Sequence, residues 1–509
     1  MDNGVRAALG LQTLPRGAAF RKNLVLTALF TLLFIVVYGG ADLLSANAEE
    51  RYQLAFEFEA HLPFVPGMAF VYLSILPLML LSPLVLETPR KLFPLFVVLS
   101  LEVLVAGVCF LLFPMQEIFP PRSDEVGNTV IFFIADTLNL RYNDLPSLHV
   151  GLSLTTAIAL SQQGRAWGRW FYVVWGVLIT ISSVLMHEHH IADVVAGSAL
   201  ALAGVYWVYP RVSSPAFVRA ARIEYICLAQ FGMFIRRHRR YLVIAVFLYA
   251  HSLFRWRKTR VLRVGFCLLQ AVDDLLDGDR PATTDPRVVA LDIARQLEDG
   301  DFATDHLSAL AESLAEDLRP LQTTAEDPLA EVSALIHHMA IDRQRVEQGL
   351  VFNAEELRRH HRTTFSHSLN LLLTAAGSST RADDVPELVD AFGWCSTVRD
   401  LEDDLEQGLV NVPADVVAAA QHEGASVIDV RQFVATEAVR RWFAAELERA
   451  EALLEAHGRR RPASDDPTGQ RILRIFDRSI GAYVRRFENM SVPFPARHPH
   501  TKKSPPPDG

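Results

Sequence analysis

The sequence predicts an all-α protein: a six-span transmembrane helical bundle followed by an all-α helical domain outside the bilayer. Three observations support the helical class and the division. Long apolar segments occupy the chain up to about residue 210 and then stop. After that point charged residues become frequent, and apolar residues recur at three- and four-residue spacing. Few stretches of this second half have the composition of β-strands.

The six predicted spans are the apolar segments 23–44, 64–86, 92–113, 149–160, 167–186 and 191–209. The first follows several basic residues, but its apolar stretch runs on and further spans follow it, so we interpret it as a retained span rather than a cleavable signal. The fourth is short and has polar flanks. We therefore expect that helix to begin before His149 or to be tilted.

Basic residues predict how these spans are oriented. Lys and Arg gather before the first span, in the second and fourth loops and after the last span, whereas the other three loops hold only Arg51, Arg122 and Arg141. Because basic loops stay in the cytoplasm, we expect an integral protein of the cell membrane with a cytoplasmic C-terminal domain. The first, third and fifth loops would then lie on the outer face.

The predicted parts are a cytoplasmic segment 1–22, a membrane domain 23–210, a linker 211–215, a helical domain 216–490 and a disordered tail 491–509. Within the helical domain, Gly and Pro residues predict breaks at 278–286, 320–328, 377–386, 408–413 and 457–467. The net charge of −9 argues against nucleic acid as a main partner. The four cysteines are scattered, so free thiols are expected. The sequence gives no indication of the oligomeric state.

Polar residues gather between the fifth and sixth spans, in the segment Met186–Gly197. Such residues at the end of a span are costly unless they are used. His189 and Asp193 are four residues apart, so on a helix they would share one face and the carboxylate could hold the imidazole. A histidine oriented by an acid is the arrangement of a nucleophile or a base.

The third loop supplies the other groups that phosphoryl transfer needs. Arg122 can bind phosphate oxygens through two hydrogen bonds. Ser147, with the backbone amides at a helix start, can bind the same anion. His189 would then attack phosphorus, and His149 would protonate the leaving alcohol. Two other interpretations are a metal cluster of neighbouring histidines and histidines that mark a membrane interface.

These residues resemble the type-2 phosphatidic acid phosphatase superfamily, above all its branch with the inositol-phosphoceramide synthases, whose second motif reads Pro-Ser-x-His as at 146–149. The resemblance covers Phe113 to Gly204 and implies a lipid phosphatase or phosphotransferase that needs no cofactor. The family's third motif is matched by Ser182, His189 and Asp193 in spacing. Its arginine is replaced by Ser183, and Met115 stands in place of the lysine of the first motif.

A second candidate site combines two pairs of carboxylates in the helical domain. Asp273 and Asp277 are four residues apart, as are Asp400 and Asp404, so each pair projects from one face of a helix. Two such faces opposite each other would form an oxygen-rich cage for Mg²⁺, which then binds a diphosphate. The alternative is that these acidic faces are solvated surface.

The two pairs resemble the motifs of squalene and phytoene synthases over roughly Tyr241 to Pro413. The resemblance implies that the second half is an all-α isoprenoid synthase-type helical domain. The first motif of that family is matched at 272–278 and the second at 399–404, and the chain departs from it at Gly393, Ser396, His360 and Asn411. The resemblance implies Mg²⁺ at the four aspartates and binding of the substrate diphosphate by Arg345 and Arg399. A class I terpene cyclase or an inactive domain of this fold is the alternative.

Together the two resemblances imply a bifunctional membrane enzyme acting on prenyl diphosphates and lipid phosphates. The helical domain would condense or cyclise prenyl diphosphates with Mg²⁺, in an apolar pocket that excludes water. The membrane domain would hydrolyse or transfer a lipid phosphate. Two alternatives are a lipid head-group transferase with an accessory helical domain and a non-catalytic scaffold that binds prenyl lipids.

Overall fold

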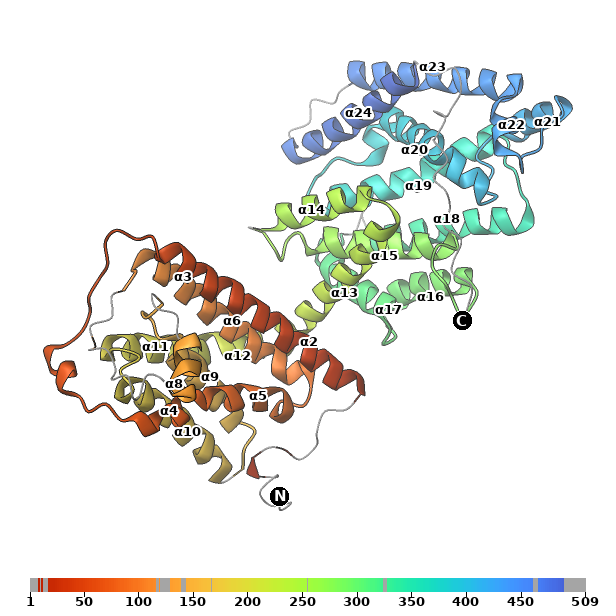
Figure 1. Ribbon diagram of the computed structural model, residues 1–509. Coiled ribbons are helices and arrows are strands. Elements are labelled where there is room, and N and C mark those ends of the chain that lie inside the picture. Colours follow the sequence, from red (N-terminus) through yellow and green to blue (C-terminus); the bar gives the residue numbers. More distant parts are fainter. Residues whose placement is uncertain are drawn as a thin grey trace. The chain divides into compact units, whose positions relative to one another are not determined.

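A computed structural model describes residues 8–9, 11, 17–115, 119, 129–138, 143–165, 167–253, 255–323, 327–460 and 466–488. These residues form helices and connecting segments without strands, apart from one isolated bridge between Tyr52 and Met115. The predicted all-α class is therefore confirmed. The chain separates into two compact units, Met1–Ala221 and Arg222–Gly509 (Figure 1). The tail 491–509, which we predicted to be disordered, lies outside the described residues.

The first unit contains the helices α2 (Gly17–Phe34), α3 (Gly40–Ser45), α4 (Ala69–Leu73), α5 (Ile75–Val85), α6 (Pro89–Leu112), α8 (Val130–Leu138), α9 (Leu148–Ser161), α10 (Trp167–Leu185), α11 (Ile191–Ala203) and α12 (Tyr209–Val212). Among the described residues, five helical stretches are long and apolar enough to cross a membrane: Gly17–Ser45, Pro66–Val85, Pro89–Leu112, Trp167–Leu185 and Ile191–Val212. These five agree with five of the six predicted spans, and they fit an integral membrane protein.

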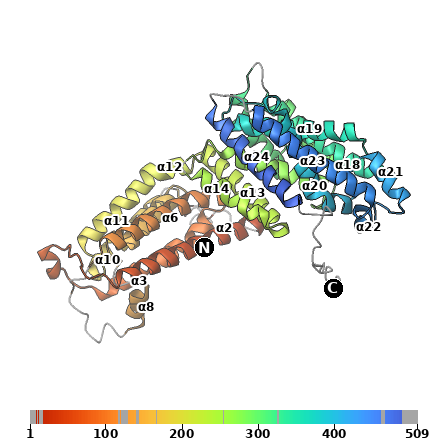
Figure 2. The same ribbon diagram turned by 90° about the horizontal axis from the view of Figure 1, so that it is seen from above.

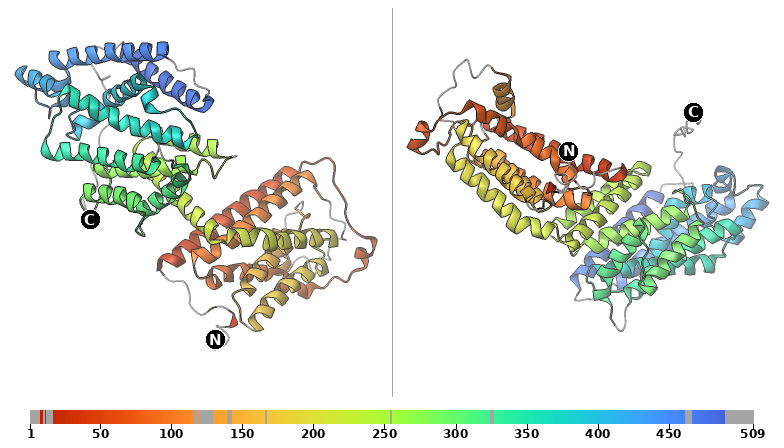
Figure 3. Two further views of the ribbon diagram at one scale, coloured as in Figure 1. Left: turned by 180° about the vertical axis from the view of Figure 1, so that it is seen from behind. Right: turned by 90° about the horizontal axis from the view of Figure 1, so that it is seen from below.

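The predicted fourth span corresponds to α9, which has only 14 residues and is too short to count as a span by length. It packs against α5, α6, α10 and α11, and most of its residues are buried. Because neighbouring helices enclose it, α9 need not be long enough to meet both surfaces of a bilayer. On the other side of α6, the helices α2 and α3 run along its length (Figure 3).

Contact between α9 and α11 is unusually close at one point. A Cβ atom on Gly197 of α11 would lie 2.4 Å from the carbonyl oxygen of Ser147, which directly precedes α9. No side chain fits there, so glycine allows the two backbones to approach. This approach places the start of α9 beside the first turns of α11.

The second unit contains α14 (Arg240–Ser252), α15 (Arg260–Leu276), α16 (Pro286–Asp299), α17 (His306–Leu318), α18 (Pro328–Gln348), α19 (Ala354–Ala375), α20 (Pro386–Glu406), α21 (Ala414–His422), α22 (Val430–Val434), α23 (Glu437–Arg460) and α24 (Pro467–Phe487), and α13 (Pro215–Arg237) leads into it. Four of the five predicted breaks fall between helices of this unit, and the fifth, 457–467, overlaps the end of α23 and residues outside the described ranges. Several begin at an Asp or Asn whose side chain accepts hydrogen bonds from the first backbone N–H groups, as at Asp327 and Asn353.

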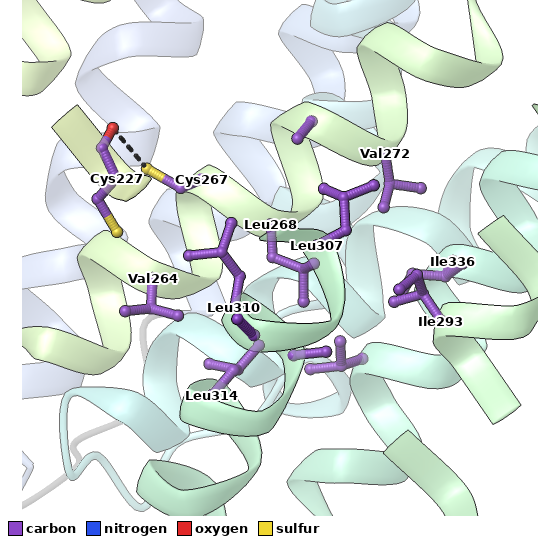
Figure 4. Packing of buried hydrophobic residues seen from close by; sticks show 14 of the residues in the cluster. Cys227, Val264, Cys267, Leu268, Val272, Ile293, Leu307, Leu310, Leu314 and Ile336 are labelled. Atoms are coloured by element: carbon purple, nitrogen blue, oxygen red, sulfur yellow. Dashed lines mark hydrogen bonds between the residues drawn. The ribbon is translucent and has the colours of Figure 1, made fainter. Parts of the chain in front are cut away.

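Successive helices of the second unit pack side by side, in the order α18, α19, α20 and α23 (Figure 2). Its largest apolar core joins α13 and α15 to α16, α17 and α18, and includes Val264, Leu268 and Leu310 (Figure 4). The Cys267 thiol donates a weak hydrogen bond, 3.7 Å long, to the carbonyl of Cys227. All four cysteines are free, as predicted.

Candidate functional site

The first candidate site is built around the start of α9. Ser147 is the N-cap residue of this helix, and its buried Oγ accepts a hydrogen bond of 3.3 Å from the backbone N–H of Val150. The backbone N–H of Ser147 donates to the carbonyl of Asp193 at 3.1 Å, which ties this turn to α11. The predicted anion-binding turn therefore lies at a helix N-terminus, where the helix dipole favours negative charge.

His149 lies in the first turn of α9 and packs on Tyr72 of α4. The two rings stack with their centroids 3.7 Å apart, and His149 Nε2 lies 2.9 Å from the Tyr72 carbonyl oxygen. A carbonyl only accepts hydrogen bonds, so Nε2 carries the proton. The ring is thereby held with a proton on Nε2, so Nδ1 is the nitrogen that can take up and release a second proton.

The position of His189 corrects one prediction. We expected His189 and Asp193 to share a helical face, but α11 begins only at Ile191, and His189 lies in the turn before it. Asp193 Oδ2 instead accepts a hydrogen bond of 2.9 Å from the backbone N–H of His190, the N-cap residue. The first N–H groups of a helix have no partner within it, and an acid three residues past the N-cap can supply one.

His189 is nevertheless buried near His149, with only 3% of its surface exposed. Its burial, followed by the charges of His149 and His190, lowers the pKa of His189 to about 3. The imidazole is therefore neutral at pH 7 and has a lone pair with which to attack. His189 Nδ1 and Asp193 Oδ1 are both buried, and neither has a hydrogen-bond partner among the described residues.

A buried pair that we did not predict supports this turn. His190 Nδ1 lies 2.7 Å from Glu59 Oε2, and both side chains are buried. The same oxygen accepts the backbone N–H of Ile191 at 3.3 Å. Glu59 comes from the segment between the first two predicted spans, which lies 131 residues from His190 in the sequence. Neither spacing nor a short motif could indicate this partner.

Arg122 lies outside the described residues, so its predicted contact with phosphate stays a prediction. Phe119, three residues earlier, is described, and its ring stacks on His187 and His190 at centroid distances of 4.4 and 4.2 Å. His187 Nε2 also lies 3.1 Å from the carbonyl oxygen of Leu62. Residues of the first, third and fifth loops thus gather at one end of the unit.

The second candidate site lies where the end of α15 meets α20. Asp273 is in the last turn of α15, and Asp277 directly follows that helix. Asp400 and Asp404 are one turn apart on α20. Arg399 Nε donates to Asp400 Oδ1 at 2.9 Å. The charge of Asp400 helps to raise the pKa of Asp273, and the charge of Asp404 helps to raise that of Asp277. The two predicted carboxylate pairs therefore lie near each other.

The pKa values of these carboxyls are raised. Burial, followed by the charges of Asp277 and Asp274, raises the pKa of Asp273 well above its ordinary value. Loss of solvent, followed by the charge of Asp404, raises the pKa of Asp277 to about 7. Burial, with the charge of Asp400 among further causes, raises the pKa of Asp404 to about 7. Burial and mutual repulsion therefore make the ionised state of these carboxyls costly unless a further cation joins them.

A chain of hydrogen bonds holds the Asp404 side chain in place. Asn411 Nδ2 donates to Asp404 Oδ2 at 2.9 Å, and Asn411 Oδ1 accepts from Arg345 Nη1 at 2.9 Å. Arg345 also donates to Asp342 at 2.8 Å, and His360 Nε2 lies 3.0 Å from the same carboxylate. His360 and Asn411 are two of the positions at which the chain departs from squalene and phytoene synthases. Both departures belong to one network.

The two predicted phosphate-binding arginines differ in their surroundings. Arg345 is only 1% exposed, and its Nη2 donates to the carbonyl of Val410 at 2.7 Å. Its side chain positions the Asp342 and Asn411 side chains rather than facing solvent. Arg399 is partly exposed but is already hydrogen-bonded to Asp400 and, at 3.2 Å, to Ser396 Oγ. Of the two, only Arg399 can reach a ligand without unpacking the helices.

The carboxylate oxygens of the second site suit Mg²⁺, which prefers oxygen ligands. Within the described ranges, no group of three or more His, Cys, Asp or Glu side chains is arranged to hold a metal ion, and this includes the neighbouring histidines of the first unit. A magnesium ion commonly uses one or two carboxylates and completes its shell with water and substrate phosphates. The two aspartate pairs fit that mode of binding.

Residues 46–207 match the family model of the PAP2 superfamily. The matched region includes Ser147, His149, His189 and Asp193, and it identifies a PAP2 superfamily domain in the membrane unit. No curated protein and no solved structure matches the chain. The match supports a phosphatase-like domain that hydrolyses or transfers a lipid phosphate.

Proposed function

We propose that the chain is a bifunctional membrane enzyme of isoprenoid and lipid metabolism. Its first unit would hydrolyse or transfer a lipid phosphate or diphosphate, and its second unit would condense or cyclise prenyl diphosphates with Mg²⁺. One observation carries the first half: His149 and the neutral His189 lie together beside the Ser147 turn, inside the region that matches the PAP2 superfamily.

In the proposed first reaction, His189 attacks phosphorus through Nε2. The nitrogen–phosphorus bond forms as the bond to the lipid oxygen breaks, and a protonated His149 gives its Nδ1 proton to the leaving alcohol. Water, or an acceptor alcohol, then attacks phosphorus and returns a proton to His149 as phosphate or the new ester departs. Pairing His189 Nδ1 with Asp193 Oδ1 would satisfy both unpartnered atoms and stabilise the charge that develops on the imidazole.

Support for the second activity comes from the four aspartates and the network behind them. Mg²⁺, when bound, would neutralise the diphosphate as it leaves an allylic carbon. The pairs Asp273 with Asp277 and Asp400 with Asp404 would each hold it through one or two carboxylates, and Asn411 would fix the orientation of Asp404. Arg399 would exchange its contact with Asp400 for one with the diphosphate.

The predicted orientation places the two sites on opposite sides of the membrane. On that orientation, either the two activities serve separate substrates or a product crosses the bilayer. The alternative functions are a head-group phosphotransferase with an accessory helical domain and a scaffold that binds prenyl lipids. The two aspartate pairs favour the bifunctional proposal, because an accessory domain has no need of so many facing carboxylates.

One product analysis separates these functions. The purified full chain is incubated with farnesyl or geranylgeranyl diphosphate, with and without Mg²⁺, and the phosphate and hydrocarbon products are identified. Pyrophosphate together with a new hydrocarbon, lost in Asp273→Ala, supports the second activity. Orthophosphate lost in His189→Ala supports the first.

Matched controls are available for both variants. Glu406→Gln changes an exposed acid on the same helix as Asp400, and His61→Ala changes an exposed histidine near Glu59. Both should leave the products unchanged. Orthophosphate as the sole product, unaffected by Asp273→Ala, would support the alternative with an accessory helical domain. No turnover of any substrate would support the scaffold that binds prenyl lipids.

A further inference from the structure

One stretch of the second unit has a charge balance opposite to that of the chain. Between Tyr225 and Val272 the sequence holds nine Lys or Arg residues and no Asp or Glu, although the net charge of the whole chain is −9. The stretch contains most of α13, all of α14 and most of α15. Neither proposed reaction accounts for so many cations here.

Two opposite faces of α14 are apolar. One face, with Tyr241 and Ala245, is buried against the core of the unit. The other face exposes Leu242, Val243, Val246 and Phe247, whose exposed fractions are 51, 71, 59 and 64%. A row of large apolar side chains at this exposure is costly in water and indicates an interaction surface.

Exposed cations lie at both ends of this apolar row. The residues concerned, none of which forms an ion pair with a described residue, are Arg236, Arg239, Arg255, Arg257 and Lys258. Trp256, in the middle of the second group, is 44% exposed. Apolar residues flanked by basic residues and an aromatic ring are typical of a helix that lies in a membrane interface.

We infer that α14 lies in the head-group region of a bilayer that contains anionic lipids. Its exposed row enters the acyl chains, and the five unpaired cations bind lipid phosphates. With 13 residues, the helix is too short to cross the bilayer, and its buried face keeps it attached to the rest of the unit. Because this face is cationic, it would repel a second copy of itself, whereas an anionic lipid surface would attract it.

The surface borders the aspartate site. Arg237, in the last turn of α13, lies 3.1 Å from Asp274, and Arg240, the first residue of α14, lies 3.7 Å from Asp400. If the second unit uses prenyl diphosphates, as proposed above, docking would bring its aspartates close to the diphosphate of a substrate whose prenyl tail is dissolved in the membrane. The docking itself does not depend on that activity.

A fluorescence experiment on the full chain tests the inference. Val246→Cys is introduced with Cys109→Ala, which removes the one cysteine that is not buried, and the new thiol carries an environment-sensitive dye. One copy is reconstituted per lipid nanodisc containing brominated phospholipids, which quench a dye within the acyl region. Ile428→Cys is the matched control, because Ile428 is an apolar residue of the same unit that is 94% exposed.

We expect quenching at position 246, but not at 428, when anionic lipid is present. Each basic residue replaced by Gln at 255, 257 and 258 should lower the docking equilibrium about fivefold. Replacing the exposed Arg471 or Arg474 of α24 by Gln should have no effect. Leu242→Cys, one turn earlier on the same face, is a second labelling position should the first variant not fold.

Three results would overturn the inference. The first is equal emission at 246 and 428 in every lipid mixture. The second is quenching that responds neither to anionic lipid nor to the loss of basic residues. The third is loss of quenching in single-copy nanodiscs together with crosslinking of the introduced thiols between copies in vesicles, which would assign this face to a dimer.

Discussion

Glu59 holds His190 through a 2.7 Å hydrogen bond between two buried side chains, and so anchors the turn that carries His189. We predict that Glu59→Ala lowers orthophosphate release by the reconstituted chain at least about tenfold, because the turn loses a buried link to the first loop. Loss of the buried contacts should also cost about 1–3 kcal/mol of stability.

Rates measured for a lipid phosphate substrate, alongside a thermal unfolding curve, check this prediction. Glu57→Ala is the control, because Glu57 is an exposed acid in the same short helical turn. Glu59→Gln should fall between the two, since an amide can still accept a hydrogen bond from the Ile191 N–H. Full activity in Glu59→Ala would show that His190 has no part in positioning the site.

Gly197→Ala should destabilise the membrane unit by about 1–3 kcal/mol, because the added Cβ would lie 2.4 Å from the Ser147 carbonyl oxygen. Relief of that clash must push the start of α9 away from α11, which also separates His149 from His189. Unfolding temperature in detergent and phosphate release should therefore fall together. Gly40→Ala is a matched helical control with no atom within 4 Å of the new Cβ. Equal behaviour of the two variants would contradict the close approach.

The sequence was sufficient to predict the helical class, five apolar spans and some of the breaks between the helices of the second unit. Apolar run length and the positions of Gly and Pro are local properties, and they determine these features directly. The predicted fourth span is different, because α9 is apolar but short. Whether such a helix meets the membrane surfaces depends on the helices that enclose it, and no local pattern records that.

For the site, sequence spacing identified groups that do come together, such as His149 with His189 and Asp404 with Asp273. Spacing does not show where two roles compete for one side chain. Asp193 was expected to hold His189, but the unpaired backbone N–H at the start of α11 takes its Oδ2. Arg345 was expected to bind phosphate, but it supplies hydrogen bonds that buried partners need.

Arg345→Lys should lower the stability of the second unit by about 1.5–3 kcal/mol, because a single ammonium nitrogen cannot replace the two guanidinium nitrogens that bond Asp342, Asn411 and Val410. Thermal unfolding and Michaelis kinetics with a prenyl diphosphate distinguish positioning from phosphate binding. We expect a lower unfolding temperature and a lower kcat. Arg399→Lys should instead raise KM with little loss of stability. A raised KM at unchanged stability in Arg345→Lys would return that residue to the phosphate-binding set.

The raised pKa values of Asp277 and Asp404, about 7 against an ordinary 3.8, predict how stability changes with pH. The folded state holds these protons more tightly than the unfolded state, so their contribution to stability is fully present below about pH 4 and is lost as the pH rises through about 7. Mg²⁺ competes with the protons and balances the exposed charge. It should therefore raise the unfolding temperature more at about pH 8 than at about pH 5.

Thermal unfolding of the full chain at both pH values, with and without Mg²⁺, measures this difference. Asp404→Asn removes one titrating group and should reduce both the loss of stability at high pH and the gain from Mg²⁺. Glu406→Gln, an exposed neighbour on α20, should reduce neither. A Mg²⁺ effect of equal size at both pH values, or one that survives in Asp404→Asn, would mean that the ion binds elsewhere, because binding at this cluster has to displace its protons.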